Sequence, residues 1–548
     1  MWSSTTWPRL ALALFCLALP LTAGAQEEEP EVVPDIFTVF NTGREIPGSL
    51  DATIESANAG SNTANTIQFG VGELEGLTLT LESEPLLPDI DLLALDPAVD
   101  RNVDLDATNV LGFRIETATD VGLDFTLLHV KSGQATLVDL EIEGTAEDSE
   151  GKRLPARFLV DADAALGFRY SADHVIRDNI VGAGSVVKEG EATLRLSGVN
   201  TYGGGTEVKE GNLLGHRDSI QGNVLVEEDA VLAFEDRTET ATHLYSGQIT
   251  GEGKVIKLDS HILHFDSGLL AVTGGAEIVD GTLTGDSDTI TSDVTIGAGA
   301  LFQLVQTADG EYAGNITGGG KFEKEGSADL TLAGTNSFSG GIDIISGKLF
   351  GNSGSIPGDI ALSNGSSQVI FDQSATIGDG IHSGNISGVG KLVKQGLGTL
   401  TLSGTSTYTG DTEIVEGTLR GDAQSLVGNI VLSSVDATAE FSFAGSQTFD
   451  GFISDLGNVT KSGTGTLILN APNSYTGATT INGGTLRLET DLPSTSSVTL
   501  AAGATLENAQ STGVTTIHGG LVSRGRIILG GVTDALLVEA GSARLEAG

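Results

Sequence analysis

Residues 388–422 read "GVGKLVKQGLGTLTLSGTSTYTGDTEIVEGTLRGD". Aliphatic residues such as Leu400, Leu402 and Ile414 alternate with threonine and other polar residues, while glycine returns every few residues. Alternation over four to eight residues indicates a strand with one buried face, and glycine between such runs indicates tight corners. The stretch therefore predicts short strands joined by turns, and it lacks the sustained 3.6-residue period of helices.

The same pattern occurs five times along the chain, once in weaker form. One lysine marks each copy and one leucine closes it, and each of these two markers recurs at nearly constant intervals. Two independent markers thus give one period of about 68 residues, which we interpret as three turns of 22 to 23 residues. The lysines are Lys188, Lys257, Lys324, Lys394 and Lys461, and the leucines are Leu213, Leu283, Leu349, Leu419 and Leu486.

Turns of this length, built from short strands with glycine or asparagine corners, are typical of a parallel β-solenoid. The sequence therefore predicts an all-β fold, a right-handed parallel β-helix with an amino-terminal cap. Glycine is expected at corners that need a positive φ, and asparagine at turns where its amide bonds the backbone. The corner glycines are Gly190, Gly326, Gly396 and Gly463, and the asparagines are Asn200, Asn336 and Asn473.

Composition divides the chain into five segments. The first carries one cation, Arg9, then an apolar run and small residues, which predicts a secretory signal peptide. A short helix with Leu50, Ile54 and Ala57 on one face is expected in the cap, which would shield the first turn from edge pairing. The segments are 1–25, signal peptide; 26–34, acidic flexible leader; 35–165, cap and irregular coils; 166–490, five repeats in a β-helix; and 491–548, further coils.

Without the signal peptide the chain has no cysteine, methionine or tryptophan, and 73 acidic against 27 basic residues, a charge of −46. Disulfides therefore cannot stabilise it, so repetitive stacking must. The acidity argues against nucleic acid and anionic lipid as partners. It predicts solubility after export, with divalent-cation binding as the alternative. No further apolar run approaches the roughly 18 residues of a membrane helix, so no transmembrane helix is predicted in the mature chain.

Two short motifs suggest sites, but the repeat explains each without a ligand. The sequence "GNSGS" around Ser353 resembles a serine-nucleophile turn, yet its counterparts "GHRDS", "GDSDT" and "GDAQS" have no consistent serine, and His382 belongs to another turn. The tripeptide from Arg420 to Asp422 could bind a receptor, but Asp422 falls on the same repeat-closing turn. We predict turns at both places and assign no catalytic, cofactor-binding or metal-binding residue and no cofactor.

An acidic run is the best candidate for an enzyme site. Carboxylates on neighbouring turns can act as acid and base on polysaccharide, although aspartate is also expected at solenoid turns, and we prefer that structural interpretation. His261 and His264 are three residues apart in a strand-like stretch, which places them on opposite faces and argues against a metal pair. The acidic residues are Asp89, Asp91, Asp96, Asp100, Asp104 and Asp106, with Arg101 among them.

Four aromatic residues fall on one position of the repeat. We predict a repeated stacking position, with a carbohydrate platform as the alternative. The marker lysines recur once per repeat, too far apart to form a positive stripe. The aromatic residues are Tyr202, Phe338, Tyr408 and Tyr475.

The repeat, over roughly residues 180–488, closely resembles the passenger-associated transport repeat of bacterial autotransporters. The segment "GSLDATIESANAGSNTANTIQF" is similar to the start of exported right-handed β-helix proteins with a pectate-lyase-like fold. The resemblance implies an extracellular passenger at the cell surface of a Gram-negative bacterium, exported through the periplasm and then through an outer-membrane β-barrel at the chain's own carboxyl end.

This resemblance implies a non-enzymatic adhesin or structural spacer, with repeats that support translocation and folding. No strands of a terminal barrel occur before Gly548, so we expect the β-barrel translocator beyond it, with a released or separately anchored rod as the alternative. A host or cell-surface ligand would be the other partner. The alternative function is a secreted β-helix polysaccharide lyase or hydrolase, with its site in residues 66–165 and the repeats as carrier.

Overall fold

The computed structural model describes residues 126–143, 155–235, 242–374, 377–490, 497–509, 514–517 and 519–529, and the backbone of eight further strands at 35–39, 64–69, 78–81, 90–91, 102–106, 114–117, 535–538 and 543–545. Every element in these residues is a strand, and neighbouring strands pair in parallel. No helix within them is long and apolar enough to cross a bilayer. The predicted all-β parallel solenoid is confirmed, while the helix expected around Ile54 lies outside the described residues.

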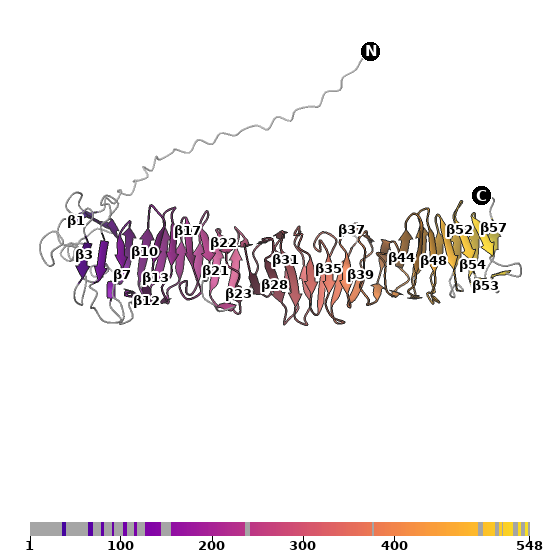
Figure 1. Cartoon of the computed structure of the whole chain (residues 1–548), viewed down its shortest axis with the longest axis horizontal. Coiled ribbons are helices and arrows are strands. Elements are labelled where there is room, and N and C mark those ends of the chain that lie inside the picture. The colour runs from indigo at the N-terminus through magenta and orange to yellow at the C-terminus, as the bar shows by residue number, and fades with distance from the viewer. Residues whose placement is uncertain are drawn as a thin grey trace, which may run out of the picture.

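The strands stack into an elongated rod with three sheet faces (Figure 1). The chain visits faces one, two and three in a fixed order and then returns to face one. For example, β39 (Lys391–Gln395) lies on face one and β40 (Thr399–Leu402) lies on face two. The chain then crosses face three without a strand, where the Thr407 amide donates to the Ile386 carbonyl of β38 (Ile386–Gly388), and β41 (Thr412–Ile414) is back on face one beside β39. Each face is a succession of hydrogen-bonded sheets along the rod.

The strands are assigned to the faces as follows. Face one contains β1 (Asp35–Val39), β2 (Ala64–Phe69), β5 (Asn102–Asp106), β7 (Thr126–Val138), β10 (Ala164–Arg169), β13 (Ser185–Glu189), β16 (Thr206–Val208), β18 (Val224–Val226), β21 (Gln248–Gly251), β24 (Leu269–Val272), β29 (Gly310–Tyr312), β32 (Leu330–Leu332), β34 (Lys348–Gly351), β36 (Gln368–Asp372), β39, β41, β43 (Ile430–Leu432) and β46 (Ile453–Asp455). Face two contains β11 (His174–Ile176), β14 (Thr193–Leu196), β17 (Asn212–Gly215), β19 (Val231–Phe234), β22 (Lys254–Lys257), β25 (Ala276–Ile278), β27 (Val294–Ile296), β30 (Ile316–Gly318), β37 (Gly380–His382), β40, β42 (Gly417–Gly421), β44 (Ala437–Ser442), β47 (Asn458–Ser462), β49 (Thr479–Ile481), β51 (Ser497–Leu500), β54 (Gly520–Ser523) and β57 (Ala543–Leu545).

Face three contains β9 (Arg157–Val160), β12 (Asn179–Gly182), β15 (Thr201–Tyr202), β20 (Thr242–Tyr245), β23 (Ile262–Phe265), β26 (Thr282–Gly285), β28 (Leu301–Val305), β31 (Lys321–Glu325), β33 (Ile342–Ile344), β35 (Ile360–Leu362), β38 (Ile386–Gly388), β45 (Ser446–Phe449), β48 (Thr466–Leu469), β50 (Thr485–Leu488), β52 (Thr505–Asn508) and β55 (Arg526–Leu529). Shorter pairings near the two ends involve β3 (Thr78–Leu81), β4 (Ile90–Asp91), β6 (Arg114–Thr117), β8 (Glu141–Glu143), β53 (Val514–Ile517) and β56 (Ala535–Val538).

The turns of the rod are shorter than the sequence predicts, so the predicted division of the repeat into three turns is wrong. Leu392 pairs with Thr412, Thr412 with Ile430, and Ile430 with Ile453. The strands that hold the five marker lysines lie on faces one, two, three, one and two in that order. A repeat therefore spans three and one-third turns, and each repeat is rotated by one face relative to the one before it.

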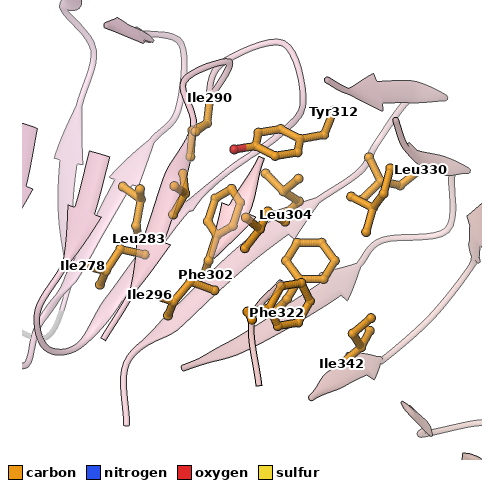
Figure 2. Close-up of a cluster of buried hydrophobic side chains, with 14 of the residues drawn as sticks. Ile278, Leu283, Ile290, Ile296, Phe302, Leu304, Tyr312, Phe322, Leu330 and Ile342 are labelled. Atoms are coloured by element: carbon orange, nitrogen blue, oxygen red, sulfur yellow. The ribbon is translucent and has the colours of Figure 1, made fainter. Parts of the chain in front are cut away.

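The core is a continuous column of inward-facing side chains, as the alternating sequence predicts. Leu283 pairs with Phe302, and Phe302 pairs with Phe322 on the next turn, so equivalent inward residues stack along the axis. The rings of Phe302 and Phe322 lie 5.7 Å apart, and Tyr312 packs against Phe302 at 5.5 Å (Figure 2). Because every turn buries its apolar face on its neighbours, no turn has a complete core alone.

The predicted corner residues occupy strained or hydrogen-bonded positions. The four glycines predicted at corners have φ between 72° and 85°, which confirms that a side chain is disfavoured there. Asn200 is buried; its Oδ1 accepts the Ile180 amide at 2.8 Å, and its Nδ2 donates to the Ser219 carbonyl at 2.6 Å. Asn336 repeats this arrangement two repeats later. These asparagines therefore tie three successive turns together.

Candidate functional site

The serine-nucleophile motif is a structural turn. The Ser353 amide donates to Gln373 Oε1 at 2.9 Å, and Gln373 Nε2 lies 3.3 Å from Ser353 Oγ. His382 is buried with its Nδ1 3.2 Å from the Ile356 carbonyl, and burial lowers the pKa of His382 to about 4. Ser353 thus lies in a turn, as predicted, and its amide and hydroxyl both contact Gln373 on the next turn.

The Arg-Gly-Asp tripeptide is held within the rod. Arg420 lies in β42, and its Nε donates to Glu440 Oε2 on the next turn at 2.9 Å. Asp422 Oδ1 accepts the amides of Gln424 and Ser425, each at 2.9 Å, so it caps the turn. The equivalent turn in the third repeat is capped in the same way by Asn352. Both charged side chains are therefore occupied by contacts that the repeat itself supplies.

Neither the acidic run nor the histidine pair forms a catalytic or metal site within the described residues. Asp104 and Asp106 belong to β5, whose backbone pairs with β2 and β7, but their side chains and most of the acidic run lie outside the described residues. His261 Nδ1 lies 3.2 Å from Asp259, whereas His264 lies 3.9 Å from Asp266. No group of three or more metal-ligating side chains occurs in the described part of the chain.

The repeated aromatic position is an interior one. The four aromatic side chains are buried, which favours the stacking interpretation over a carbohydrate platform. Tyr408 Oη lies 2.5 Å from Thr412 Oγ1, and equivalent tyrosine–threonine pairs occur in the first and last repeats. In the third repeat the two positions hold Phe338 and Ile342, both buried, so both hydroxyls are absent together.

The third repeat has Phe338 and Ile342 where the fourth has Tyr408 and Thr412, which predicts energetic coupling between positions 408 and 412. We expect Tyr408→Phe to lower the free energy of unfolding by about 1 kcal/mol, because Thr412 loses one hydrogen bond. Thr412→Ile alone should cost more, since it leaves the buried Tyr408 hydroxyl without this partner. The double variant reproduces the Phe338–Ile342 pair, so a double-mutant cycle should give a cost below the sum of the two single costs. Additive costs would contradict the coupling.

The marker lysines, which sequence reasoning considered only as a weak positive stripe, are buried inside the rod. Lys394 Nζ donates to three backbone carbonyls: Gln395 at 3.0 Å, Gly396 at 2.6 Å and, on the next turn, Glu416 at 3.2 Å. Lys188 and Lys324 each donate to three carbonyls in the same way. Each of these three lysines therefore donates a hydrogen bond to the carbonyl of a corner glycine and also binds a carbonyl of the next turn, so it joins two turns.

The second repeat departs from this arrangement. Asp259 stands where the other copies have the corner glycine, and its Oδ1 lies 2.8 Å from Lys257 Nζ. His261 also contacts Asp259, and its ring packs on His243 at 5.3 Å. In this copy only, Lys257 Nζ thus binds one carboxylate and two backbone carbonyls, whereas the other marker lysines bind three backbone carbonyls. The adjoining cavity, lined by residues including His216 and Phe234, has a volume of about 10 Å³, room for one water molecule.

Burial lowers the pKa of Lys188, Lys324 and Lys394 to about 8, against the opposing effect of nearby carboxylates. Between about pH 8 and the ordinary value near 10.5, the unfolded chain binds more protons than the folded one, so this contribution to stability rises with pH. We expect the urea midpoint of the wild type to rise from pH 7.5 to 9.5 relative to that of Lys394→Met. Identical pH slopes for the two proteins would contradict this prediction.

Two open depressions occupy equivalent positions two repeats apart. The first, of about 490 Å³ on face one, is lined by residues including Gly205, Glu207 and Asn223. The second, of about 220 Å³ on face three, is lined by their counterparts Gly341, Asp343 and Asp359. Because each repeat is rotated by one face, the same surface feature is presented in different directions along the rod.

Four segments of the chain match the family model of the passenger-associated transport repeat. They correspond to the first, third, fourth and fifth predicted copies, and the copy with Asp259 is not among them. The matched residues are 186–214, 322–349, 392–420 and 459–488.

The chain is also similar to a protein described as "Adhesin BmaC autotransporter" from Brucella suis biovar 1 (strain 1330). The two are 31% identical over 374 residues, which cover 56% of this chain and 10% of that protein. The chain thus spans about a tenth of the length of this curated relative. No solved structure matches the chain.

Proposed function

From the premise that the chain is a β-solenoid with passenger-associated transport repeats, similar to an adhesin autotransporter, we propose that it acts as an autotransporter passenger at the surface of a Gram-negative bacterium. Its role would be that of an adhesin or a structural spacer. The observation that carries the proposal is the uninterrupted core, in which matched repeats place a buried lysine and a corner glycine at each equivalent position. A rod of this kind suits the presentation of binding surfaces at a distance from the membrane.

The partners in this proposal are an outer-membrane β-barrel translocator and a host or cell-surface ligand. Stacking supports a role for the repeats in folding and translocation, because each turn that forms offers an edge on which the next turn can pair. The absence of cysteine after residue 16 leaves the mature chain free of disulfides that would hinder passage through a pore.

The proposal is tested by display on bacterial cells. The chain would be fused upstream of an autotransporter barrel in a Gram-negative host, and external protease and antibody labelling would report its location. We expect surface labelling and increased attachment to host cells, with attachment inhibited by the purified rod if it is an adhesin. Surface display without any attachment would leave the spacer role, and a folded rod retained inside the cell would contradict the passenger role.

A polysaccharide lyase or hydrolase remains the alternative, and the adhesin relative does not favour it. Its test is the incubation of the purified protein with a broad panel of glycans. Cleavage that is lost on replacement of Asp104 and Asp106 by asparagine would establish the enzyme. Inactivity of the intact protein on the whole panel would count against it.

A further inference from the structure

Four exposed apolar residues line the edge between faces one and two, near the carboxyl-terminal half of the rod. They lie in the segments that join β36 to β37, β39 to β40, β43 to β44, and β46 to β47. We call them the apolar corner: Ile377, Leu397, Val435 and Leu456, with exposed fractions of 47%, 61%, 66% and 51%.

The apolar corner extends over successive turns of the rod. A Cβ placed on Gly398 would lie 2.5 Å from the Gly378 carbonyl, so the Leu397 corner stacks on that of Ile377. Asn458 Nδ2 donates to the Val435 carbonyl at 2.9 Å, which places the Leu456 corner beside that of Val435. The turn between these two pairs passes through Glu416 and Gly417, and neither is an exposed apolar residue.

Other repeats show that the fold does not need apolar residues at these positions. Leu397 corresponds to Glu191 in the first repeat and to Thr464 in the last. Val435 corresponds to Asp229, and Leu456 corresponds to Glu252. Polar residues are tolerated at the same corners of the same fold, so stability of the turn does not explain the apolar corner. Exposed apolar residues concentrated in this way indicate an interaction surface.

Carboxylates accompany the apolar corner on the same segments. Asp379, Glu416, Asp436 and Asp455 form no ion pair within the described residues. On the adjoining faces the cations are already paired, Lys391 with Glu413 and Arg420 with Glu440. Lys394, buried beneath this corner, offsets one of the four charges. The corner therefore combines exposed apolar side chains with a net negative charge that no ion pair of the described residues neutralises.

We propose that the apolar corner binds a cationic amphipathic helix. Four steps separate the turns of Ile377 and Leu456, so at about 4.8 Å per step the row spans roughly 19 Å, the length of a helix of about 13 residues. The helical pitch of about 5.4 Å brings one apolar residue to each turn of the rod, whereas same-side residues of a strand recur at about 6.7 Å. Lysine or arginine at the helix flanks would face the unpaired carboxylates.

A second copy of the chain fits this surface less well. It would bring its own acidic row against the first, and like charges directly opposed are unfavourable. The inference goes beyond the proposed function and does not depend on it, because binding can be measured with purified protein while display and attachment are measured on cells.

The test uses the purified mature chain and two fluorescein-labelled peptides, each just long enough to span the row as a helix. Both contain the same leucines and lysines, one at helical spacing and the other in strict alternation. In fluorescence anisotropy we expect the helical peptide to bind at least tenfold more tightly than the alternating one. The variant Leu397→Gln/Leu456→Gln should weaken binding at least tenfold, and Glu416→Gln/Asp436→Asn should weaken it and reduce its salt dependence. Val199→Gln, which replaces an exposed valine elsewhere with an exposed fraction of 60%, should change affinity less than twofold.

Three results would overturn the proposal. Equal affinity for the two peptides would reduce the interaction to charge alone. An equal loss in the Val199→Gln control would remove the link to the apolar corner. A concentration-dependent dimer in sedimentation that Leu397→Gln/Leu456→Gln abolishes would make a second copy the occupant. Circular dichroism of each variant would verify folding, which the polar counterparts in other repeats lead us to expect.

Discussion

Replacing Lys394 with methionine should lower the free energy of unfolding of the surrounding turns by about 3 kcal/mol or more. Methionine fills a similar volume but donates no hydrogen bond, so the carbonyls of Gln395, Gly396 and Glu416 lose their buried donor. An unsatisfied buried polar group costs about 1–3 kcal/mol, and only part of this can be recovered by relaxation. The buried cation is therefore expected to be a structural clip between two turns.

Lys391 provides a matched control in the same strand. Its Nζ forms a half-buried ion pair with Glu413 Oε2, and ion pairs that solvent still reaches contribute about 1 kcal/mol or less. Hydrogen exchange is the suitable measurement, because a solenoid can open locally. Lys394→Met should reduce protection in β39 and β41, and Lys391→Met should leave it nearly unchanged. Similar effects from the two variants would contradict the structural role of the buried lysine.

Replacing Gly388 with alanine should be at least as damaging, with a cost of about 4 kcal/mol. The residue has a φ of 102°, and an added Cβ would lie 2.1 Å from the Leu362 carbonyl oxygen of the preceding turn. Backbone strain contributes about 1–3 kcal/mol, and the overlap must be relieved by separating two stacked strands. The damage should therefore spread along β35 and β38.

Two further glycines distinguish the cost of a positive φ from the cost of a clash between the added Cβ and the preceding turn. Gly378 has a φ of 77° but open space around its Cβ position, so alanine there should cost about 1–2 kcal/mol. Gly365 also has open space and no positive φ, so alanine should change stability by about 0.5 kcal/mol or less. Urea denaturation of the three variants should rank them Gly388, Gly378, Gly365 in decreasing cost. Equal costs at Gly388 and Gly365 would show that the turns are not packed as described.

The fold class could be predicted because the alternating strands and corner glycines are local signals. The stretch around Leu400 and Leu402 shows both, and the two residues are inward in β40. The number of turns per repeat could not be obtained in this way. It depends on how many corners the chain turns, and short corners such as the one at Glu416 are not distinguished by sequence similarity from longer ones such as that at Val435.

The buried lysines could have been predicted from strand parity. Leu392 and Lys394 are two residues apart in one strand, so both point inward, and the same parity holds for Phe322 and Lys324. The apolar corner could not have been predicted, because its residues are unrelated in repeat position. They share an edge of the rod because each lies at the same corner of its own turn, and the lengths of those turns are not given by the repeat pattern.

The central claim, that each repeat makes three and one-third turns and is therefore rotated by one face, is tested most directly by disulfide trapping. The chain has no cysteine after Cys16, so pairs introduced into residues 26–548 can be read without background. Glu323 and Asp343 are paired on adjacent strands, which suits a disulfide, whereas Ser346 lies three residues, or roughly 10 Å, further along the chain. Glu323→Cys/Asp343→Cys should oxidise readily and Glu323→Cys/Ser346→Cys should not. The reverse result would support the longer turns that three equal turns per repeat require, and it would contradict the three-faced rod.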